Sequence, residues 1–535
     1  MAMEQLALLP PGQLLITAVV SLLVIIVTFH LFGSRYLHAP KGVPVATVIK
    51  GDWKATLLKA TTEYPDEPFL LPSFRPRVIL PNHVMDEVRR LPEDQLSLRK
   101  EIFNNMHGRY SELGAEHALG VSAIKNDLTN NIGRMLPELQ DETIFALNQH
   151  IGPAPDWTQL YLYQKLLHIS ALTNGRFFVG LPMSRNPAWI TACLKYTSDL
   201  ISVVMAVGIT KFFIGPLVHL VAPFLPQIRN FRKDKVVGSK VLRPAIDALL
   251  LSRQKPDAVE NPASNQYNLI SWILNRMDTT GAVDFDTIAL EQLFAGFASI
   301  HNTAVTVINI LFDLASHPQY IPAIRAEIEE VLREEPDQII RKINLPKLRK
   351  LDSLLRESQR MNPASLTSLQ RLVVAKDGIK LSTGHTIPRG TSIGFMHPFA
   401  PWVKTPSNLE SHLALVQGQP PLEDFYPFRH SEMRAVPGHE NGHQFVQTGP
   451  DNINFGHGPM ACPGRFFAGA EVKCIIIEIL RRYDVALGPG GEGAGGPSGL
   501  KRPTNVTYPN LFLLPDFKTP LYFKELPQVV PVMRS

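Results

Sequence analysis

One segment constrains this chain more than any other, the run FGHGPMACPGR from Phe455 to Arg465. Its glycines allow the backbone to approach a flat ligand closely. Its single cysteine, Cys462, lies in a tight turn, and the residues after Pro463 read as a long helix that ends near Arg482. At the start of a helix, free N–H groups and the positive end of the helix dipole stabilise a thiolate. The segment therefore predicts a cysteine thiolate that faces a planar group.

The use of cysteine narrows this chemistry further. The 535 residues include three cysteines, Cys193, Cys462 and Cys474. A disulfide scaffold and a zinc site of four cysteines are thereby excluded, and the sparse, odd count suits a reducing compartment. A thiolate held in such a turn can serve as the axial ligand of haem iron, where it favours O–O cleavage. We expect Cys462 to be that ligand; the alternative is a buried structural cysteine that follows a loop.

The N-terminal region contains a long apolar run. Leu14–Phe32 is 19 residues without a charge, about 28 Å as a helix, which is close to the thickness of a bilayer core. Basic residues begin only after the run, at Arg35, so the positive-inside rule places the short N-terminus outside and the bulk of the chain in the cytosol. We expect a membrane anchor at 1–33 and a hinge at 34–51. A cleaved signal peptide is the alternative, although the basic n-region of one is lacking.

Beyond the hinge, the pattern is mostly helical, and we expect one catalytic domain at 52–535. Short strands are expected within 368–395 and near 505–525, so the predicted fold is mainly α with a small β region. Apolar residues at three- and four-residue spacing predict helices near 122–147, 157–180, 187–214, 233–252, 265–277, 284–316, 318–334 and 346–361.

The region 203–225 is very apolar and is interrupted by Pro216 and Pro223. These prolines argue against a second transmembrane helix. Two interpretations stay open. The segment forms core helices, or it forms a surface that dips into a membrane beside a substrate entrance.

Three segments together resemble the cytochrome P450 family of haem-thiolate monooxygenases, and most closely its microsomal members in fungal secondary metabolism. They are Ala298–His301, Lys125–Thr129 and Cys462–Ala468. The resemblance covers nearly the whole chain. It implies a roughly triangular, mainly helical fold with a small sheet region, preceded by the transmembrane helix.

The resemblance also implies a cofactor and partners. The cofactor is haem b, with Cys462 on the iron and Phe455, Gly458 and Gly464 around it. Electrons would come from NADPH through a separate P450 reductase, with cytochrome b5 as a further donor, because the chain has no room for a fused reductase. The implied location is the endoplasmic reticulum membrane, single-pass, with the catalytic domain in the cytosol. No Lys/Arg-rich arm indicates nucleic-acid binding.

A second family element is Glu-x-x-Arg. Four such pairs occur, but only Glu357 and Arg360 lie on a predicted helix just before the strand region. They are one helical turn apart on one face, which allows an ion pair. In the family this pair is completed by an arginine from Phe-x-Pro-x-Arg, a pattern that Phe425–Arg429 matches 33 residues before Cys462. The implied role of Glu357, Arg360 and Arg429 is to support the cysteine loop.

The third element is the long helix through His301, which in the family crosses the oxygen face of the haem. That helix usually carries an acid and then a threonine that delivers protons. Here His301 falls at the acid position and Asn302 at the threonine position, with Thr303 one residue further round the helix. Histidine can shuttle protons. Asparagine can donate an N–H, but it cannot both give and accept a proton as a hydroxyl can.

Two departures concern the haem propionates. Met460 stands two residues before Cys462, where the family often has arginine or histidine, and Val121 and Lys125 replace the family's Trp-x-x-x-Arg. Lysine can pair with a propionate as a point charge, whereas methionine can only pack. The segment 397–425 is also longer than usual, through an insertion or an error in the gene model.

The leading expectation is a monooxygenase that oxidises a lipophilic secondary metabolite, such as a terpenoid, by inserting one atom of O₂. A haem-thiolate isomerase, dehydratase or ring-forming enzyme is the runner-up because Asn302 replaces the usual hydroxyl. A haem protein without catalysis is the third possibility.

Overall fold

The computed structural model describes residues 40–73, 75–115, 118–253, 267–277, 283–400, 415–493, 500–508 and 511–527. The expected anchor at Leu14–Phe32 lies outside the described residues. The described end of the expected hinge lies along the first sheet. There the Ala46 N–H donates to the Leu70 carbonyl (2.9 Å), and the Leu70 N–H donates to the Pro44 carbonyl (2.8 Å).

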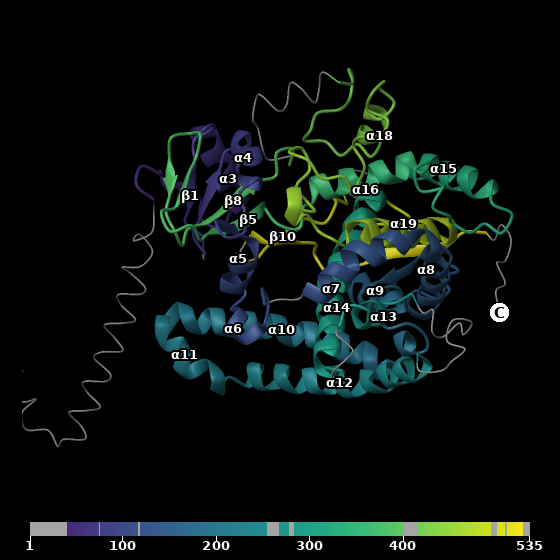
Figure 1. Cartoon of the computed structure of the whole chain (residues 1–535). Coiled ribbons are helices and arrows are strands. Elements are labelled where there is room, and N and C mark those ends of the chain that lie inside the picture. The colour runs from purple at the N-terminus through teal and green to yellow at the C-terminus, as the bar shows by residue number, and fades with distance from the viewer. Residues whose placement is uncertain are drawn as a thin grey trace, which may run out of the picture.

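Helices form most of the described chain (Figure 1). Their bounds are α3 Trp53–Glu63, α4 Met85–Arg89, α5 Leu98–Asn105, α6 Gly108–Ser111, α7 Ala118–Ala123, α8 Thr129–His150, α9 Leu162–Phe178, α10 Pro187–Ile214, α11 Val218–Val221, α12 Pro226–Arg253, α13 Leu269–Leu274, α14 Phe285–Ser316, α15 Ile321–Arg333, α16 Arg349–Met361, α18 Arg429–Met433 and α19 Arg465–Arg482.

The strands form small sheets. Their bounds are β1 Phe69–Leu71, β2 Arg77–Leu80, β3 Leu96–Ser97, β4 Thr158–Leu160, β5 Thr367–Val373, β6 Ile379–Lys380, β7 Thr386–Ile387, β8 Ser392–Met396, β9 Tyr483–Ala486, β10 Val506–Thr507, β11 Leu513–Leu514 and β12 Leu521–Glu525. The largest sheet has the order β1-β2-β8-β5-β3, and within it β2 and β8 are parallel. The expectation of a mainly α fold with a small β region is confirmed.

The sheet and the helical body lie on different sides of the molecule. In Figure 1 the sheet of β1, β8 and β5 lies at the upper left, and α8, α9, α14 and α19 pack together on the right. Helix α14 contacts α9, α10, α12, α16 and α19. It is therefore the central helix of the core, and its apolar residues pack on several sides at once.

The boundaries of several helices differ from those predicted. Helix α12 begins at Pro226 rather than near 233, and the helix predicted over 265–277 is limited to α13. The segment predicted to be helical from 157 starts as strand β4, because it pairs with β12 far along the chain. Local periodicity cannot reveal such a long-range pairing. The predicted helices at 187–214 and 284–316 are confirmed by α10 and α14.

The apolar region 203–225 is partly core and partly surface. Val203, Val207 and Val218 are buried, whereas Leu220 is 69% exposed and Phe224 is 79% exposed. Two helical stretches are long and apolar enough to cross a membrane, Pro187–Phe224 and Phe285–Ser316. The second is largely buried as α14, whereas only 28% of the first is buried. In Figure 1 the first begins as α10, which lies above α12 in the lower part of the picture.

Candidate functional site

The cysteine loop is closed by its own backbone. The Cys462 N–H donates to the Phe455 carbonyl (2.7 Å), and α19 begins three residues after the cysteine. Gly456 and Gly458 have φ of +73° and +78°, conformations that favour glycine. Gly464 occupies the N-cap of α19. The glycines thus allow the chain to turn sharply and present the thiol at the start of a helix.

The thiol of Cys462 is half-buried. Burial raises its pKa, and this effect outweighs the backbone N–H groups of Gly464 and Arg465, which lower it. The helix end alone therefore does not make Cys462 a thiolate, although the sequence favoured that interpretation. A metal cation bound at the sulfur would favour the deprotonated form.

Helix α7 and the turn after it lie against the cysteine loop. The turn Ile124–Leu128 is π-helical, a local irregularity that is frequent at functional sites. Ile124 Cγ2 lies 3.7 Å from the position that a Cβ on Gly464 would occupy. Lys125 and Val121 are exposed. The structure thus brings the segment of Lys125 beside the cysteine loop, as the family pattern implies.

A cavity of about 160 Å³ lies on the other side of this loop. Arg89, Arg90, Arg371 and His457 line it with Met460 and one carboxylate, Glu93, together with apolar residues of α4 and the large sheet. Both ring nitrogens of His457 are buried without a hydrogen-bond partner in the described part of the chain. Arg371 is half-buried, and its guanidinium donates to the Gln370 carbonyl (2.8 Å). Cationic and polar groups therefore surround Met460, although methionine itself replaces the arginine or histidine that the family often has at this position.

Helix α14 carries a stripe of accessible side chains on an otherwise buried surface. The stripe includes Phe297, Ala298, His301, Asn302 and Thr306, which recur at helical spacing. The Asn302 amide nitrogen donates to the Ala298 carbonyl (2.8 Å), which uses one of its two N–H donors. Thr306 lies one turn further along the same face and donates to the Asn302 carbonyl (2.8 Å). The sequence analysis did not single out Thr306.

His301 shares a hydrogen bond with a tyrosine from another helix. Tyr163 Oη, on α9, lies 2.8 Å from His301 Nδ1, and the Tyr163 ring stacks on Phe517 at 3.7 Å between centroids. Burial lowers the pKa of His301, so the imidazole is neutral at pH 7. Tyr163 therefore orients His301, a contact that no local pattern in the sequence predicts.

Thr303 points away from the accessible stripe. It is buried and donates to Glu471 Oε2 on α19 (3.0 Å). The other oxygen of Glu471 accepts from Thr173 (2.6 Å) and Asn174 (2.8 Å). Burial raises the pKa of Glu471 to about 7. This contact joins α14 to the helix that follows the cysteine loop, so Thr303 connects helices rather than lining the site.

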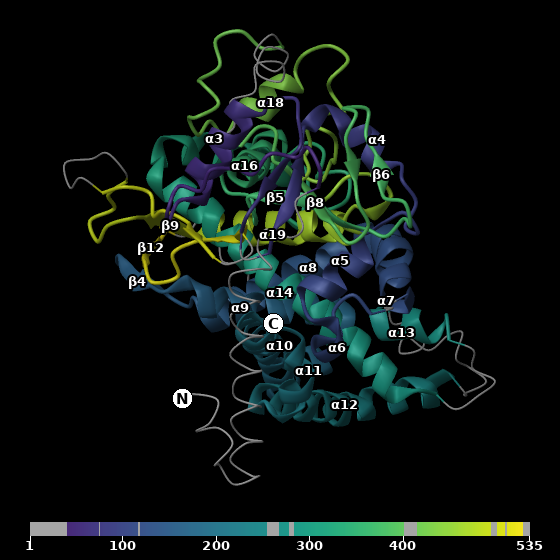
Figure 2. The ribbon, with the colours of Figure 1, turned by 90° about the vertical axis from the view of Figure 1, so that its left-hand side faces the viewer.

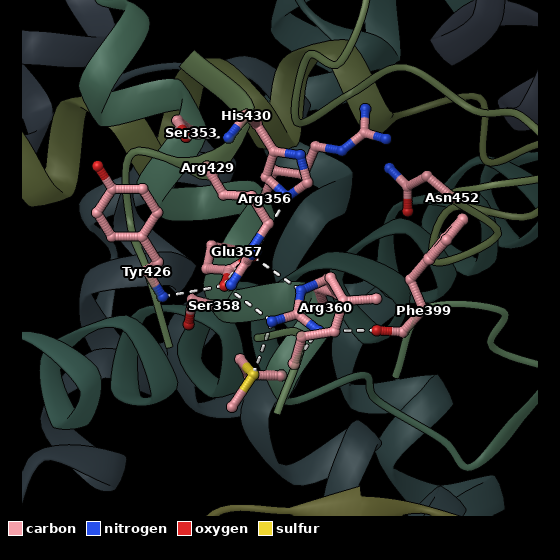
Figure 3. Close-up of polar contacts among 12 residues, drawn as sticks. Ser353, Arg356, Glu357, Ser358, Arg360, Phe399, Tyr426, Arg429, His430 and Asn452 are labelled. Atoms are coloured by element: carbon pink, nitrogen blue, oxygen red, sulfur yellow. Dashed lines mark hydrogen bonds and ion pairs between the residues drawn. The ribbon is translucent and has the colours of Figure 1, made fainter. Parts of the chain in front are cut away.

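Glu357 is the centre of a fully buried ionic cluster (Figure 3). Arg360 binds both carboxylate oxygens at 2.8 Å, and the Arg429 Nε lies 3.1 Å from Oε1. His430 Nε2 lies 3.4 Å from Oε2, and the Tyr426 N–H donates to Oε1 (3.0 Å). Burial would raise the pKa of Glu357, but Arg360 and then His430 hold it well below its usual value. The sequence motifs located two of these partners, and His430 was missed.

The cluster also holds the chain on both sides of the extra segment. Arg360 donates to the carbonyls of Phe399 and Leu422, each at 2.8 Å. Arg429 donates to the Pro420 carbonyl (2.8 Å). The two flanks of 401–414 are therefore fixed to α16, while 401–414 itself lies outside the described residues.

Comparison with known proteins agrees with this geometry. The family model of cytochrome P450 matches residues 209–398 and 422–494. Cytochrome P450 monooxygenase ascG of Acremonium egyptiacum is 34% identical over 504 residues, which cover 90% of this chain and 91% of that protein. The chain belongs to the cytochrome P450 family. The resemblance seen in the sequence is confirmed, and so is the enzyme class of P450 monooxygenases.

Further relatives of the same class match similar shares of both chains. Cytochrome P450 monooxygenase ataF of Aspergillus terreus is 33% identical over 88% of both chains. Cytochrome P450 monooxygenase gliF of Aspergillus fumigatus is 35% identical over 81% of this chain and 83% of its own. These relatives therefore match more than four fifths of this chain.

The residues present fit the haem-thiolate iron that the family implies. Cys462 supplies a sulfur ligand that the protein alone leaves as a thiol, and α14 supplies an accessible face in the core. The ring of His457 is buried beside the loop, with Nε2 3.8 Å from Asp86 Oδ1, and its single N–H could donate to a carboxylate. A planar group with an iron centre and carboxylate arms would satisfy all three features.

Proposed function

We propose that this P450 is a membrane-anchored monooxygenase that oxidises a lipophilic secondary metabolite, such as a terpenoid, with O₂ and electrons from NADPH. One observation carries the proposal. Cys462 lies at the start of α19. Glu471 of α19 accepts a hydrogen bond from Thr303 of α14, and the Ala298–Asn302 face of α14 remains accessible within the core.

Several residues would hold haem b. Cys462 would bind the iron, with Phe455, Gly458 and Gly464 shaping the loop around it. Lys125 would meet one propionate from the π-helical turn, and Arg89, Arg371 and His457 would meet the carboxylates from the cavity beside Met460. Once bound, the haem-thiolate iron supplies the activation of O₂. Because cations from α4 and β5 surround the cavity, Met460 need not weaken cofactor retention.

The face of α14 that we assign to the oxygen side of the haem carries neutral side chains. His301, held by Tyr163, is neutral and can pass a proton between its ring nitrogens. Asn302 retains one N–H for a hydrogen bond to a water or an oxygen ligand. Thr306 supports the Asn302 turn through its carbonyl. We infer that a positioned water between these groups replaces the usual threonine hydroxyl.

Membrane placement supports the same proposal. We infer an anchor at 1–33, a hinge at 34–51 and a cytosolic catalytic domain at 52–535, at the endoplasmic reticulum. The exposed apolar side chains Phe213, Leu220 and Phe224 favour the second interpretation of region 203–225, a surface in contact with lipid. The reductase and cytochrome b5 would approach from the cytosol.

The test is isotope incorporation. The full chain in lipid vesicles with NADPH and a fungal P450 reductase is supplied with ¹⁸O₂ and a panel of lipophilic terpenoids and acids. A product that carries one ¹⁸O atom and depends on NADPH supports the proposal. Turnover without NADPH favours the haem-thiolate isomerase or dehydratase, which Asn302 in place of a hydroxyl still motivates. Haem binding with no product from any substrate favours the non-catalytic alternative.

A further inference from the structure

A hollow of about 480 Å³ opens between α10, the connection from β1 to β2, and the strand pair β10–β11. Its walls are largely apolar, with Trp53, Met205, Ile209 and Leu511 among the lining side chains. This volume lies in the usual range for pockets that bind small molecules. The hollow is therefore large enough for a lipophilic ligand of moderate size.

One residue of the hollow interacts electrostatically with the tyrosine that holds His301. Tyr508 lines the hollow, and Tyr508 is close enough to Tyr163 to contribute, after burial, to a Tyr163 pKa of about 12. Tyr163 in turn shares the hydrogen bond with His301. The hollow is therefore linked electrostatically, through Tyr508 and Tyr163, to His301.

One charged side chain in the hollow lacks a complete set of partners. Arg75 Nη2 lies 3.0 Å from His107 Nε2, but Arg75 Nη1 is buried and has no hydrogen-bond partner within the described ranges. Burial lowers the pKa of Arg75 to about 10, so the guanidinium remains charged at neutral pH. A buried donor without a partner costs free energy, and a ligand acceptor would recover it.

The surroundings of Arg75 carry an excess of positive charge. Arg77 and Lys211 both lie close enough to interact with it electrostatically. His107 is neutral because burial, and then Arg75 and Lys211, lower its pKa to about 3. Glu101 is the carboxylate that acts to raise the pKa of Arg75. Its Oε1 already accepts hydrogen bonds from Ser392 (2.5 Å) and Asn105. Two further cations and one engaged carboxylate leave the hollow electropositive.

A glycine makes room for this arrangement. A Cβ on Gly208 of α10 would lie 3.3 Å from His107 Nε2 and 3.9 Å from Arg75 Nη2. Any side chain there would fill the space beside the guanidinium. The absence of one at position 208 leaves space beside Arg75 Nη2, and Arg75 is among the residues that line the hollow.

We propose that the hollow binds a substrate that is a lipophilic carboxylate, with its carboxylate on Arg75 and its apolar body against the apolar walls formed by Met205, Ile209 and Leu511. The inference rests on the proposed function, since it names the substrate class of the same site. A planar guanidinium matches a carboxylate with two parallel hydrogen bonds, and the apolar walls suit the rest of the molecule.

Calorimetry with the haem-loaded full chain tests the proposal. The probes are dodecanoate and methyl dodecanoate, which have the same chain but differ in charge. We expect dodecanoate to bind at least tenfold more tightly. Arg75→Gln should weaken dodecanoate binding by roughly tenfold to a hundredfold, the range for a hydrogen bond to a charged group, and leave the ester unchanged. Lys240→Gln, an exposed cation on α12, is the matched control and should change neither.

Equal affinities of the wild-type protein for the acid and the ester would overturn the proposal, and this comparison needs no variant to fold. So would an Arg75→Gln protein that folds and still prefers the acid. Calorimetry does not depend on turnover. Selective binding of dodecanoate without any oxygen incorporation would therefore refute the proposed monooxygenase function alone, and oxygen incorporation with no preference for the acid would refute the carboxylate site alone.

Discussion

Two buried carboxylates, Glu357 and Glu471, show how differently the two sides of this P450 are built. Both are fully buried. Glu357 is surrounded by Arg360, Arg429 and His430, and its pKa lies well below the usual value. Glu471 accepts from neutral Thr173, Asn174 and Thr303, and burial raises its pKa to about 7. The cluster around Glu357 on α16 is thus fixed by charge, while the contact between α14 and α19 is held by neutral donors.

The largest effect is expected at Glu357. Glu357→Gln leaves Arg360 and Arg429 buried without a counter-charge, and breaking a buried ion pair in this way typically costs about 3–5 kcal/mol. We expect the free energy of unfolding to fall by that amount in urea titrations, with loss of haem. Glu330→Gln, at an exposed carboxylate in α15, is the control. An unchanged unfolding midpoint would contradict the role assigned to the cluster.

The second prediction concerns pH. The pKa of Glu471 is raised in the folded state, so the folded protein binds a proton that the unfolded chain has lost. Its stabilising contribution is present below the unfolded pKa near 4.5 and is lost as pH rises to about 7, a change of about 3 kcal/mol. Glu471→Gln should flatten this part of the stability profile. An identical slope in the variant would show that Glu471 is not the group responsible.

A smaller effect is expected at the distal histidine. Tyr163→Phe removes the hydrogen bond to His301 Nδ1 and should cost about 1 kcal/mol of stability. The variant should also change how product formation depends on pH, because His301 is no longer oriented. Tyr161→Phe, an exposed tyrosine just before α9, is the matched control. A pH profile that matches the wild type would remove Tyr163 from the proposed role.

The smallest effect on stability is expected at Asn302, which stands where the family usually has threonine. Asn302 is exposed, so Asn302→Thr should change the free energy of unfolding by less than about 0.5 kcal/mol. The restored hydroxyl should raise the fraction of NADPH electrons that reach product. Thr303→Asn, at the buried neighbour, should instead disturb Glu471 and lower stability. No gain in coupling for Asn302→Thr would contradict the proposed water-assisted proton delivery.

The sequence predicted those parts of the site that depend on local spacing. The Cys462 loop, the Glu357–Arg360 turn and Arg429 are short motifs, and the apolar periodicities of α10 and α14 extend over many residues. Fold class and family followed from them. Strand β4 was missed because its pairing partner β12 lies more than 350 residues along the chain.

The polar contacts of α14 could not be predicted in the same way. Tyr163 meets His301 and Glu471 meets Thr303 only after α9, α14 and α19 have packed together. Glu471 is one of three charged residues in the interior of α19, beside Lys473 and Glu478, so its charge alone did not distinguish it. Arg75 also had no signal, because its missing partner is evident only when burial is known.

The most direct test of the account is the carbon monoxide difference spectrum of the reduced protein, measured beside Cys462→Ser. The account predicts a strongly red-shifted band of the thiolate type in the wild type, which the serine variant lacks. A band typical of histidine- or thiol-ligated haem, or the same band in both proteins, would contradict the assignment of Cys462 as the ligand around which the site is built.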